Sequence, residues 1–216
     1  MNSLINNPKL VFDFDGVVFH NKKVNDKIIE KSVGYVKSKT GYSYEQSLDF
    51  NNSNYQKYGH TATMLKRYGY EASLDEYNEY VFDSDLWGHL RKHISDDDHV
   101  RVECVNTANT LLGYKSILFS NAPYIWCYKV LDMMNYDIDD MFKNVYSGMS
   151  ESSLKPNSTL YNVIEYSNRN ADELHFFDDN KKNLENLSEQ WKPHYVNPNV
   201  SLDEYVKPVV DEIIKR

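Results

Sequence analysis

Two aspartates separated by one residue follow a short apolar run near the start of the chain. Asp13 and Asp15 come after Leu10-Val11-Phe12, and Gly16 follows them. Alternate side chains of a strand point the same way, and glycine lets the backbone turn sharply without a side-chain clash. One carboxylate could attack a phosphorus atom while the other transfers protons, with a bound cation neutralising the pair. An Asp-rich strand end before glycine is also an ordinary turn, so both interpretations stay open here.

A calcium-binding loop of the EF-hand type is excluded by spacing. Such a loop needs glycine at its sixth position and glutamate at its twelfth. Counted from Asp13, these positions hold Val18 and Val24.

Composition limits the classes of protein to which the chain could belong. Its 216 residues, 41% of them hydrophobic, are enough for one domain or for a main domain with a smaller insertion. The net charge of −8 opposes binding to a nucleic acid polymer, whereas a small phosphorylated metabolite remains compatible. Residues 1–8 lack the pattern of a secretory signal, and no apolar stretch is long enough to span a membrane. We therefore expect a cytoplasmic protein without membrane contact, either a monomer or a homodimer.

The two cysteines carry no recognisable motif. Cys104 and Cys127 lie far apart in the sequence, without CxxC or Cys/His spacing. We expect unpaired and mostly packed thiols in a reducing compartment.

Hydrophobic patterns predict strands that alternate with helices, which is typical of a parallel sheet covered on both faces. The predicted strands are 9–13, 115–119, 144–147, 173–177 and 194–196. The predicted helices are 24–39, 54–68, 73–82, 97–112, 123–135, 157–166, 181–190 and 202–215. Four of these helices follow one another between the first two strands, and those before 97–112 indicate a helical insertion.

Polar residues stand at three predicted strand ends, where open parallel sheets bind their ligands. Asp13 ends the first strand, Ser120-Asn121 follow the second, and Asp178-Asp179 follow the fourth. A hydroxyl and free N–H groups at Ser120-Asn121 would suit a phosphate, and an adjacent acidic pair would suit Mg²⁺. Both pairs could instead be ordinary helix caps.

Lys155 precedes Pro156 after the third predicted strand. A fixed ammonium at this point could neutralise a nucleophile and an incoming phosphate. Taken alone, Lys155 would be read as a surface lysine.

Together these segments resemble the haloacid dehalogenase-like (HAD) superfamily. Its motifs of DxD, Ser or Thr, Lys and an acidic pair correspond in order to Asp13/Asp15, Ser120, Lys155 and Asp178/Asp179. The resemblance covers the chain from Lys9 to about Leu187 and implies an α/β fold with a Rossmann-like parallel sheet sandwiched by helices.

The resemblance also implies a role for each residue. Asp13 would be the nucleophile that forms an aspartyl-phosphate, and Asp15 would be the general acid/base, which superfamily dehalogenases lack. Ser120, Asn121 and Lys155 would hold the phosphoryl group. Mg²⁺ would be bound by the Asp13 side chain, the Asp15 carbonyl and Asp178, with Asp179 as a direct or water-mediated ligand.

The same resemblance divides the chain into a core of residues 1–18 and 99–216 and a helical cap of the C1 type at 19–98. The cap holds nine of the eighteen tyrosines, which could stack on a base or sugar or could simply pack a small subdomain. Residues 54–69 are similar to the cap of the pyrimidine 5′-nucleotidase branch. Gly16-Val17 and Ser120 depart from that branch, which has Asn-Thr and Thr there. The cap tyrosines that could stack on a base or sugar include Tyr55, Tyr58, Tyr68, Tyr77 and Tyr80.

Three histidines near the end of this region invite a metal interpretation. His89 and His93 have a spacing that could bind zinc, and His99 lies near them beside 96–98, a run of three aspartates. The simpler interpretation is a solvated hinge with an aspartate capping the next helix.

The sequence therefore predicts a Mg²⁺-dependent phosphomonoesterase acting on a small phosphorylated metabolite, with a nucleoside 5′-monophosphate as the first candidate. A phosphomutase would use the same residues but return the phosphoryl group to its substrate. The alternative from another class is a non-catalytic protein that binds a phosphorylated ligand on the same fold.

Overall fold

The computed structural model describes residues 7–156 and 158–216. Five strands form one sheet in the order β3-β2-β1-β4-β5, and every neighbouring pair is parallel. This confirms the expected α/β fold. The strands are β1 (Lys9–Phe12), β2 (Ser116–Phe119), β3 (Phe142–Tyr146), β4 (Leu174–Asp178) and β5 (Trp191–Tyr195).

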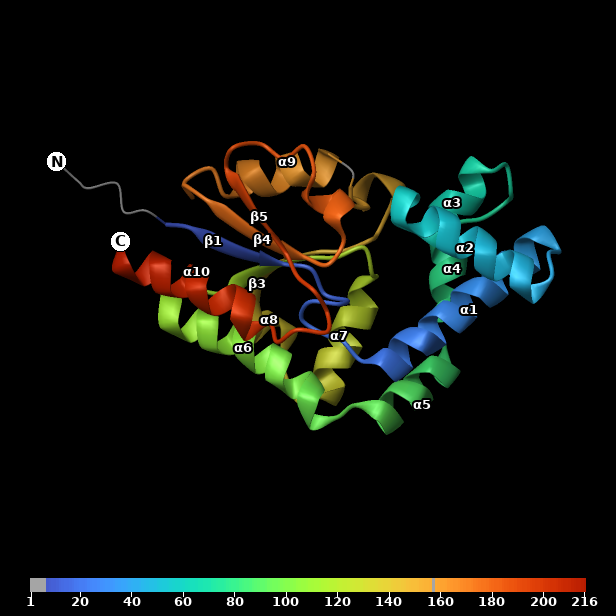
Figure 1. The fold of residues 1–216 in the computed structure, drawn as a ribbon, viewed down its shortest axis with the longest axis horizontal. Coiled ribbons are helices and arrows are strands. Elements are labelled where there is room, and N and C mark those ends of the chain that lie inside the picture. Colours follow the sequence, from blue (N-terminus) through green and yellow to red (C-terminus); the bar gives the residue numbers. More distant parts are fainter. Residues whose placement is uncertain (1–6, 157) are drawn as a thin grey trace.

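Helices cover both faces of the sheet (Figure 1). The helices of the core are α6 (Asp96–Leu112), α7 (Tyr124–Met133), α8 (Ile138–Met141), α9 (Ser158–Ser167) and α10 (Asp203–Lys215), with a 3₁₀ turn η1 (Glu151–Ser153) before α9. The helices between β1 and α6 are α1 (Lys22–Thr40), α2 (Tyr44–Tyr58), α3 (Thr61–Arg67), α4 (Leu74–Val81) and α5 (Ser84–His93).

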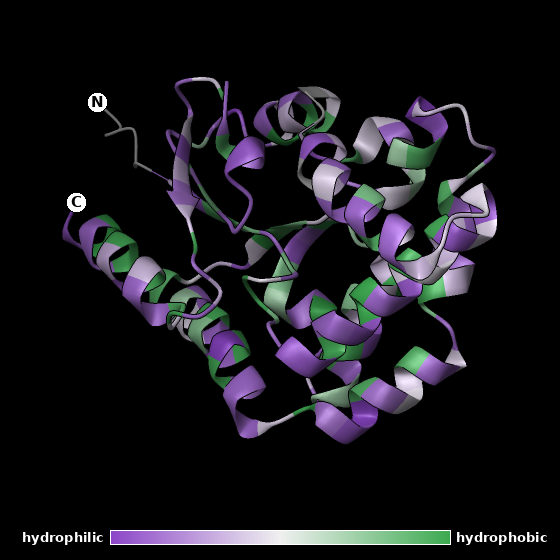
Figure 2. Cartoon of the chain, turned by 45° about the vertical axis from the view of Figure 1, so that its right-hand side comes forward, coloured by the Kyte–Doolittle hydropathy of each residue, from purple (hydrophilic) through white to green (hydrophobic). Residues whose placement is uncertain are grey.

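Alternate side chains of the central strand β1 enter two different hydrophobic clusters. Leu10 and Phe12 pack with residues of α6, α7 and α10, whereas Val11 packs with Tyr161 and Ile164 of α9. The period of two along the strand therefore fills both sides of the sheet. In Figure 2 the helices are hydrophobic on part of their circumference and hydrophilic on the rest, as covering helices should be.

The five helices α1–α5, which we call the insertion, lie together beyond one end of the sheet (Figure 1). A second region of hydrophobic packing joins Tyr35, Val36, Met64 and Leu65 of these helices with Leu154 from the segment before α9. The division into a core of 1–18 and 99–216 and a cap of 19–98 stays a prediction.

One helix predicted within the insertion, 54–68, is wrong in its bounds. The helix α2 begins ten residues earlier, at Tyr44, where Ser43 caps it through a capping box with Gln46. Gly59, at φ +69°, then ends α2. His60 caps α3 by accepting the backbone N–H of Ala62 on Nδ1. Local capping therefore overrides an apolar pattern that runs across the break.

Two further predictions need correction. The helix α5 was not predicted, although Asp83 caps it by accepting the N–H groups of Asp85 and Leu86. The predicted helix 181–190 is only a 3₁₀ turn, η2 (Lys181–Leu184), followed by an irregular segment. The turn is held by Asn183, whose side chain bonds Asp178 instead of joining a helical face.

The short helix α8 was not predicted either, and β5 begins three residues before the predicted strand 194–196. The remaining helices agree with the predictions to within a few residues. Residue 157, the predicted start of α9, lies outside the described residues, as do residues 1–6 of the N-terminal segment judged to lack a secretory signal. Cys104 and Cys127 are both free and buried, as expected. None of the helices in the described part of the chain is long and apolar enough to cross a membrane.

Candidate active site

The ends of β1, β2 and β4 bring the predicted residues to one edge of the sheet. Phe12, the last residue of β1, pairs with Leu118 of β2 and with Phe177 of β4. Because the three strands are parallel and in this register, the residues that follow them leave the sheet side by side. Asp13 therefore lies between Ser120 on one side and the Asp178-Asp179 pair on the other.

Lys155 joins two of these carboxylates. Its Nζ lies 2.9 Å from Oδ1 of Asp13 and 2.6 Å from Oδ2 of Asp178. Lys155 is only 1% exposed, so the surface-lysine interpretation is wrong. Burial lowers the pKa of Lys155, but the charges of Asp13 and Asp178 outweigh burial and leave the pKa above its usual value. The side chain is a fixed positive charge at the centre of the site.

Asp13, Asp178 and Asp179 form an acidic group whose oxygens can all lie within 4.8 Å of one another. Burial raises the pKa of Asp13 well above its usual value, Lys155 opposes this effect, and Asp178 and Asp179 add to it. Burial and the neighbouring Asp178 likewise raise the pKa of Asp179 to about 7. One lysine therefore does not neutralise the group.

The donor set fits Mg²⁺. Three carboxylates supply the hard oxygen ligands that this ion prefers, and the excess negative charge favours a divalent cation. Lys155 engages Oδ1 of Asp13, which also accepts the N–H of Phe14 at 2.7 Å. Within the described part of the chain, Oδ2 of Asp13 has no hydrogen-bond donor. Asp15 lies outside this carboxylate group, so its predicted contribution would come from its backbone carbonyl.

The side chain of Asp15 is directed to a different partner. Its Oδ1 accepts a hydrogen bond of 2.9 Å from Nε1 of Trp126 in α7. Burial raises the pKa of Asp15 to about 6, against the opposing effects of Trp126 and Lys155. A carboxyl that titrates near neutrality suits a group that must both give and take a proton.

Ser120 and Asn121 lie where predicted, but their side chains differ in role. Ser120 is buried, and its Oγ accepts the N–H of Ala122 at 3.1 Å. The side chain of Asn121 accepts the N–H of Lys155 at 2.6 Å and donates to the carbonyls of Lys155 and Gly59. Because these hydrogen bonds occupy the side-chain amide of Asn121, only the backbone N–H of Asn121 would remain to contact a phosphate. That contact stays a prediction.

Sequence reasoning missed two residues that hold the carboxylates. Trp126 is one, and Asn183 is the other, with Nδ2 lying 3.0 Å from each oxygen of Asp178. Asn183 is itself fixed, since Tyr161 donates to its carbonyl at 2.6 Å. Neither residue type signals a site by itself. Only the spacing of Asn183, five residues after Asp178, offered a hint.

The insertion approaches this edge at the C-terminal end of α2. A Cβ atom on Gly59 would lie 2.4 Å from the carbonyl oxygen of Lys155, so only glycine allows this approach. The carbonyl oxygen of Tyr55, one turn earlier, accepts the N–H of Gly59. Burial raises the pKa of the Tyr55 hydroxyl, and the charges of Tyr77, Asp15, Asp179 and Asp13 raise it further, although the residue as a whole is 43% exposed. The charges of the carboxylates therefore reach its hydroxyl.

Four other tyrosines of the insertion behave as packing residues. Tyr58 and Tyr68 meet edge to face at 6.2 Å, and Tyr68 donates to Asn54. Tyr77 is buried, with its hydroxyl 2.7 Å from that of Ser32. Tyr80 packs against Tyr35. Of Tyr55 and these four residues, we assign only Tyr55 to the site.

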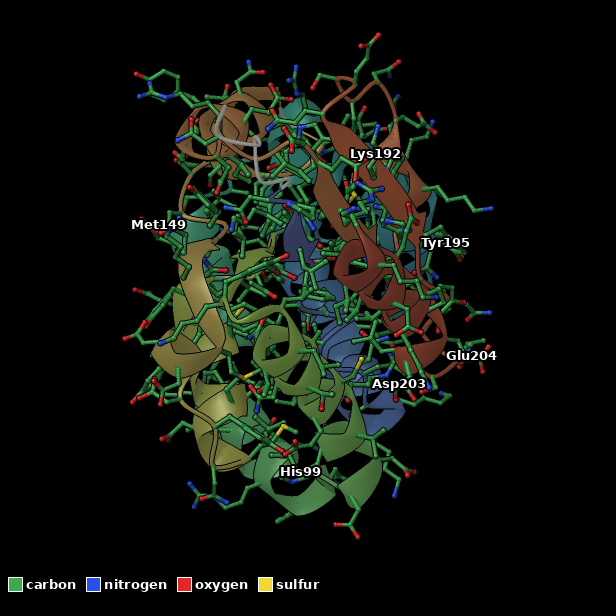
Figure 3. All side chains as sticks on the ribbon, turned by 90° about the vertical axis from the view of Figure 1, so that its left-hand side faces the viewer. His99, Met149, Lys192, Tyr195, Asp203 and Glu204 are labelled. Atoms are coloured by element: carbon green, nitrogen blue, oxygen red, sulfur yellow. The ribbon has the colours of Figure 1, made fainter. Side chains whose placement is uncertain are left out.

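The histidines lie apart from the carboxylates. His89 and His93 stack at 4.2 Å, with Nδ1 of His93 bonded to the carbonyl of His89. His99 lies at the periphery near the start of α6 and packs on Tyr136 (Figure 3). Within residues 7–156 and 158–216, the group formed by Asp13, Asp178 and Asp179 is the only set of three ligating side chains close enough to share an ion.

The sequence matches no protein-family model and no curated protein. The fold is similar to that of a "putative beta-phosphoglucomutase from Thermotoga maritima", with a TM-score of 0.54 and 14% identity over 97% of this chain and 99% of the other. A second similar structure is that of a "predicted phosphoglycolate phosphatase from haemophilus somnus 129pt", with a TM-score of 0.48 and 14% identity over 100% of this chain and 99% of the other. A third is that of a "HAD phosphatase from Thermococcus onnurineus", with a TM-score of 0.47 and 14% identity over 82% of this chain and 79% of the other. The first of these similarities supports the expected Rossmann-like fold.

Proposed function

We propose that this chain is a Mg²⁺-dependent phosphomonoesterase of the HAD type that hydrolyses a small phosphorylated metabolite through an aspartyl-phosphate on Asp13. The observation that carries the proposal is the buried group in which Lys155 bridges Asp13 and Asp178 beside Asp179. An ion pair that served stability alone would not require a third carboxylate, that of Asp179, at the same edge of the sheet.

The residues divide the reaction into two displacements. Asp13 would attack phosphorus, forming a carboxyl O–P bond as the ester P–O bond breaks, and Asp15 would give its proton to the departing oxygen. Asp15 would then take a proton from water as that water attacks the aspartyl-phosphate, which releases inorganic phosphate and restores Asp13. Lys155 and Ser120 would hold the phosphoryl oxygens. Mg²⁺, when bound by Asp13, Asp178, Asp179 and the Asp15 carbonyl, would neutralise charge on the transferring group.

The position of Tyr55 supports a substrate with an aromatic or hydroxylated leaving group. Its ring is partly exposed, and the charges of the carboxylates reach its hydroxyl, so it could contact a sugar or base. We propose a nucleoside 5′-monophosphate as the first substrate to test.

The deciding experiment measures phosphate release by the purified chain on p-nitrophenyl phosphate, nucleoside 5′-monophosphates and sugar phosphates with Mg²⁺. We expect turnover that excess EDTA and Asp13→Asn both abolish. Asp26→Asn is the matched control, because Asp26 forms an exposed ion pair with Lys22 and should leave activity unchanged. Activity retained by Asp13→Asn would refute the proposal.

Two outcomes would select the alternatives. A wild-type chain that releases no phosphate from any compound, yet binds one of them in calorimetry, would be a non-catalytic binding protein. Activity that appears only as isomerisation, and only with a bisphosphate present, would indicate a phosphomutase.

A further inference from the structure

Trp126 contacts the site from a helix that sequence reasoning did not connect with it. The indole N–H can only donate, and it points at Oδ1 of Asp15 over a distance of 2.9 Å. Within the described residues, the other oxygen of Asp15, Oδ2, has no hydrogen-bond donor. The two carboxyl oxygens of Asp15 are therefore not equivalent.

The Trp126 ring is held on several sides and is fully buried. Phe19 meets it edge-on at 6.1 Å, Phe82 lies at 5.3 Å, and Trp87 lies at 5.6 Å. Phe82 and Trp87 belong to the α4–α5 part of the insertion, and α7 lies between that part and the sheet (Figure 1). A ring packed in this way cannot turn without disturbing its neighbours, so the direction of its N–H is fixed.

We propose that Trp126 is a positioning residue for Asp15: it engages Oδ1, so that Asp15 transfers its proton through Oδ2. This inference rests on the proposed function. Because Phe82 and Trp87 pack on the same ring, the insertion helps to set the orientation of the carboxyl.

The test separates proton transfer from other defects by changing the leaving group. An alkyl phosphate needs a proton on its departing oxygen, whereas 2,4-dinitrophenyl phosphate has a leaving group stable enough to depart without one. The ratio kcat/KM reports the steps up to the first irreversible one. A positioning defect should therefore affect only the alkyl substrate.

Trp126→Phe keeps an aromatic ring and removes the donor. We expect kcat/KM for an alkyl phosphate that the wild type hydrolyses to fall on the order of tenfold, while the value for 2,4-dinitrophenyl phosphate changes less than twofold. Trp191→Phe is the matched control, because Trp191 is a buried tryptophan whose indole N–H donates to Glu165 and not to Asp15, and both values should stay near wild type. Asp15→Asn serves as the reference for complete loss of the acid.

Two features keep the result interpretable. The ratio of the two kcat/KM values on one preparation is independent of the fraction of folded protein. If Trp126→Phe does not fold, β-(3-benzothienyl)alanine at position 126 keeps the indole shape with sulfur in place of N–H. Equal losses on both substrates, or no loss on either, would overturn the role of Trp126 while the phosphatase proposal stands. Failure of the wild type on every substrate would instead refute the proposed function.

Discussion

Gly16 lies directly against Asp179: a Cβ atom on Gly16 would come within 2.2 Å of Oδ2 of Asp179. Gly16 also has φ +81°, a conformation that other residues rarely adopt. This glycine thus determines both the turn after the DxD motif and the place of the acidic pair.

Gly16→Ala should displace the Asp179 carboxylate and weaken Mg²⁺ binding by about 10–100-fold, the range found when metal-ligand positioning is lost. Calorimetric titration with Mg²⁺ would measure the change. Gly69→Ala is the matched control, because Gly69 has φ +85° but nothing within 4 Å of its Cβ position. Both variants should lose about 1–2 kcal/mol of stability to backbone strain. Equal Mg²⁺ affinity in the two would show that the Asp179 contact does not matter.

Lys155→Met should lower the free energy of unfolding by about 3–5 kcal/mol in the absence of metal, because Asp13 and Asp178 would be left as buried carboxylates without their cation. Added Mg²⁺ should recover part of this loss by binding the same carboxylates. Urea denaturation with and without Mg²⁺ would measure both effects. Lys66→Met, which removes the exposed ion pair with Glu151, should change little. A Lys155→Met variant as stable as wild type in EDTA would contradict the prediction.

Tyr55→Phe should lower kcat/KM about fivefold to tenfold for phosphates of hydroxylated alcohols, the effect of one lost hydrogen bond. Phenyl phosphate, which offers no hydroxyl to this group, should be hydrolysed as well as by the wild type. Tyr44→Phe provides a control, since Tyr44 is similarly exposed on the same helix but lies at its N-terminal end. Steady-state kinetics on the two substrates would decide, and a uniform loss on both would exclude a specific contact.

The buried His175 and its half-buried neighbour His194 should make stability depend on pH. Their rings lie 3.0 Å apart between Nδ1 of His175 and Nε2 of His194, and Nε2 of His175 lies 3.3 Å from Glu173. Burial lowers the pKa of both, that of His194 to about 4. Below pH 6.5 the unfolded chain therefore binds protons that the folded chain excludes, and this contribution to stability falls as pH drops from 6.5 towards 4.

The raised pKa values of Asp15 and Asp179 act in the opposite direction, so the contribution of His194 must be isolated by substitution. The difference in unfolding free energy between wild type and His194→Gln should shift by about 1 kcal/mol in favour of the variant between pH 7.5 and pH 5, allowing for screening of a partly exposed group. Urea denaturation at the two pH values would measure the shift. A difference that is constant with pH would mean that His194 titrates normally.

The sheet and its carboxylates could be predicted from the sequence because both depend on short-range rules. The period of two in β1 sets which side chains enter each face, and parallel strands must end at a common edge, so Asp13, Ser120 and Asp178 could be placed together before any contact was known. The bounds of helices were less predictable. The apolar pattern of 54–68 crosses the break at Gly59, and the run 181–190 is helical in pattern while Asn183 is bound elsewhere.

What the sequence by itself determined is which residue types stand at the ends of the strands. Only the tertiary structure decided that Lys155 is buried between two carboxylates and that the Asn121 side chain bonds the backbone of Lys155. It also decided that Trp126 donates a hydrogen bond to Asp15, 111 residues away in the chain. These relationships depend on contacts between segments distant in the chain, and no local periodicity encodes them. These interactions are strong because they are buried, where charges and hydrogen bonds are screened less than in water. The short distances that they need exist only once the chain has folded.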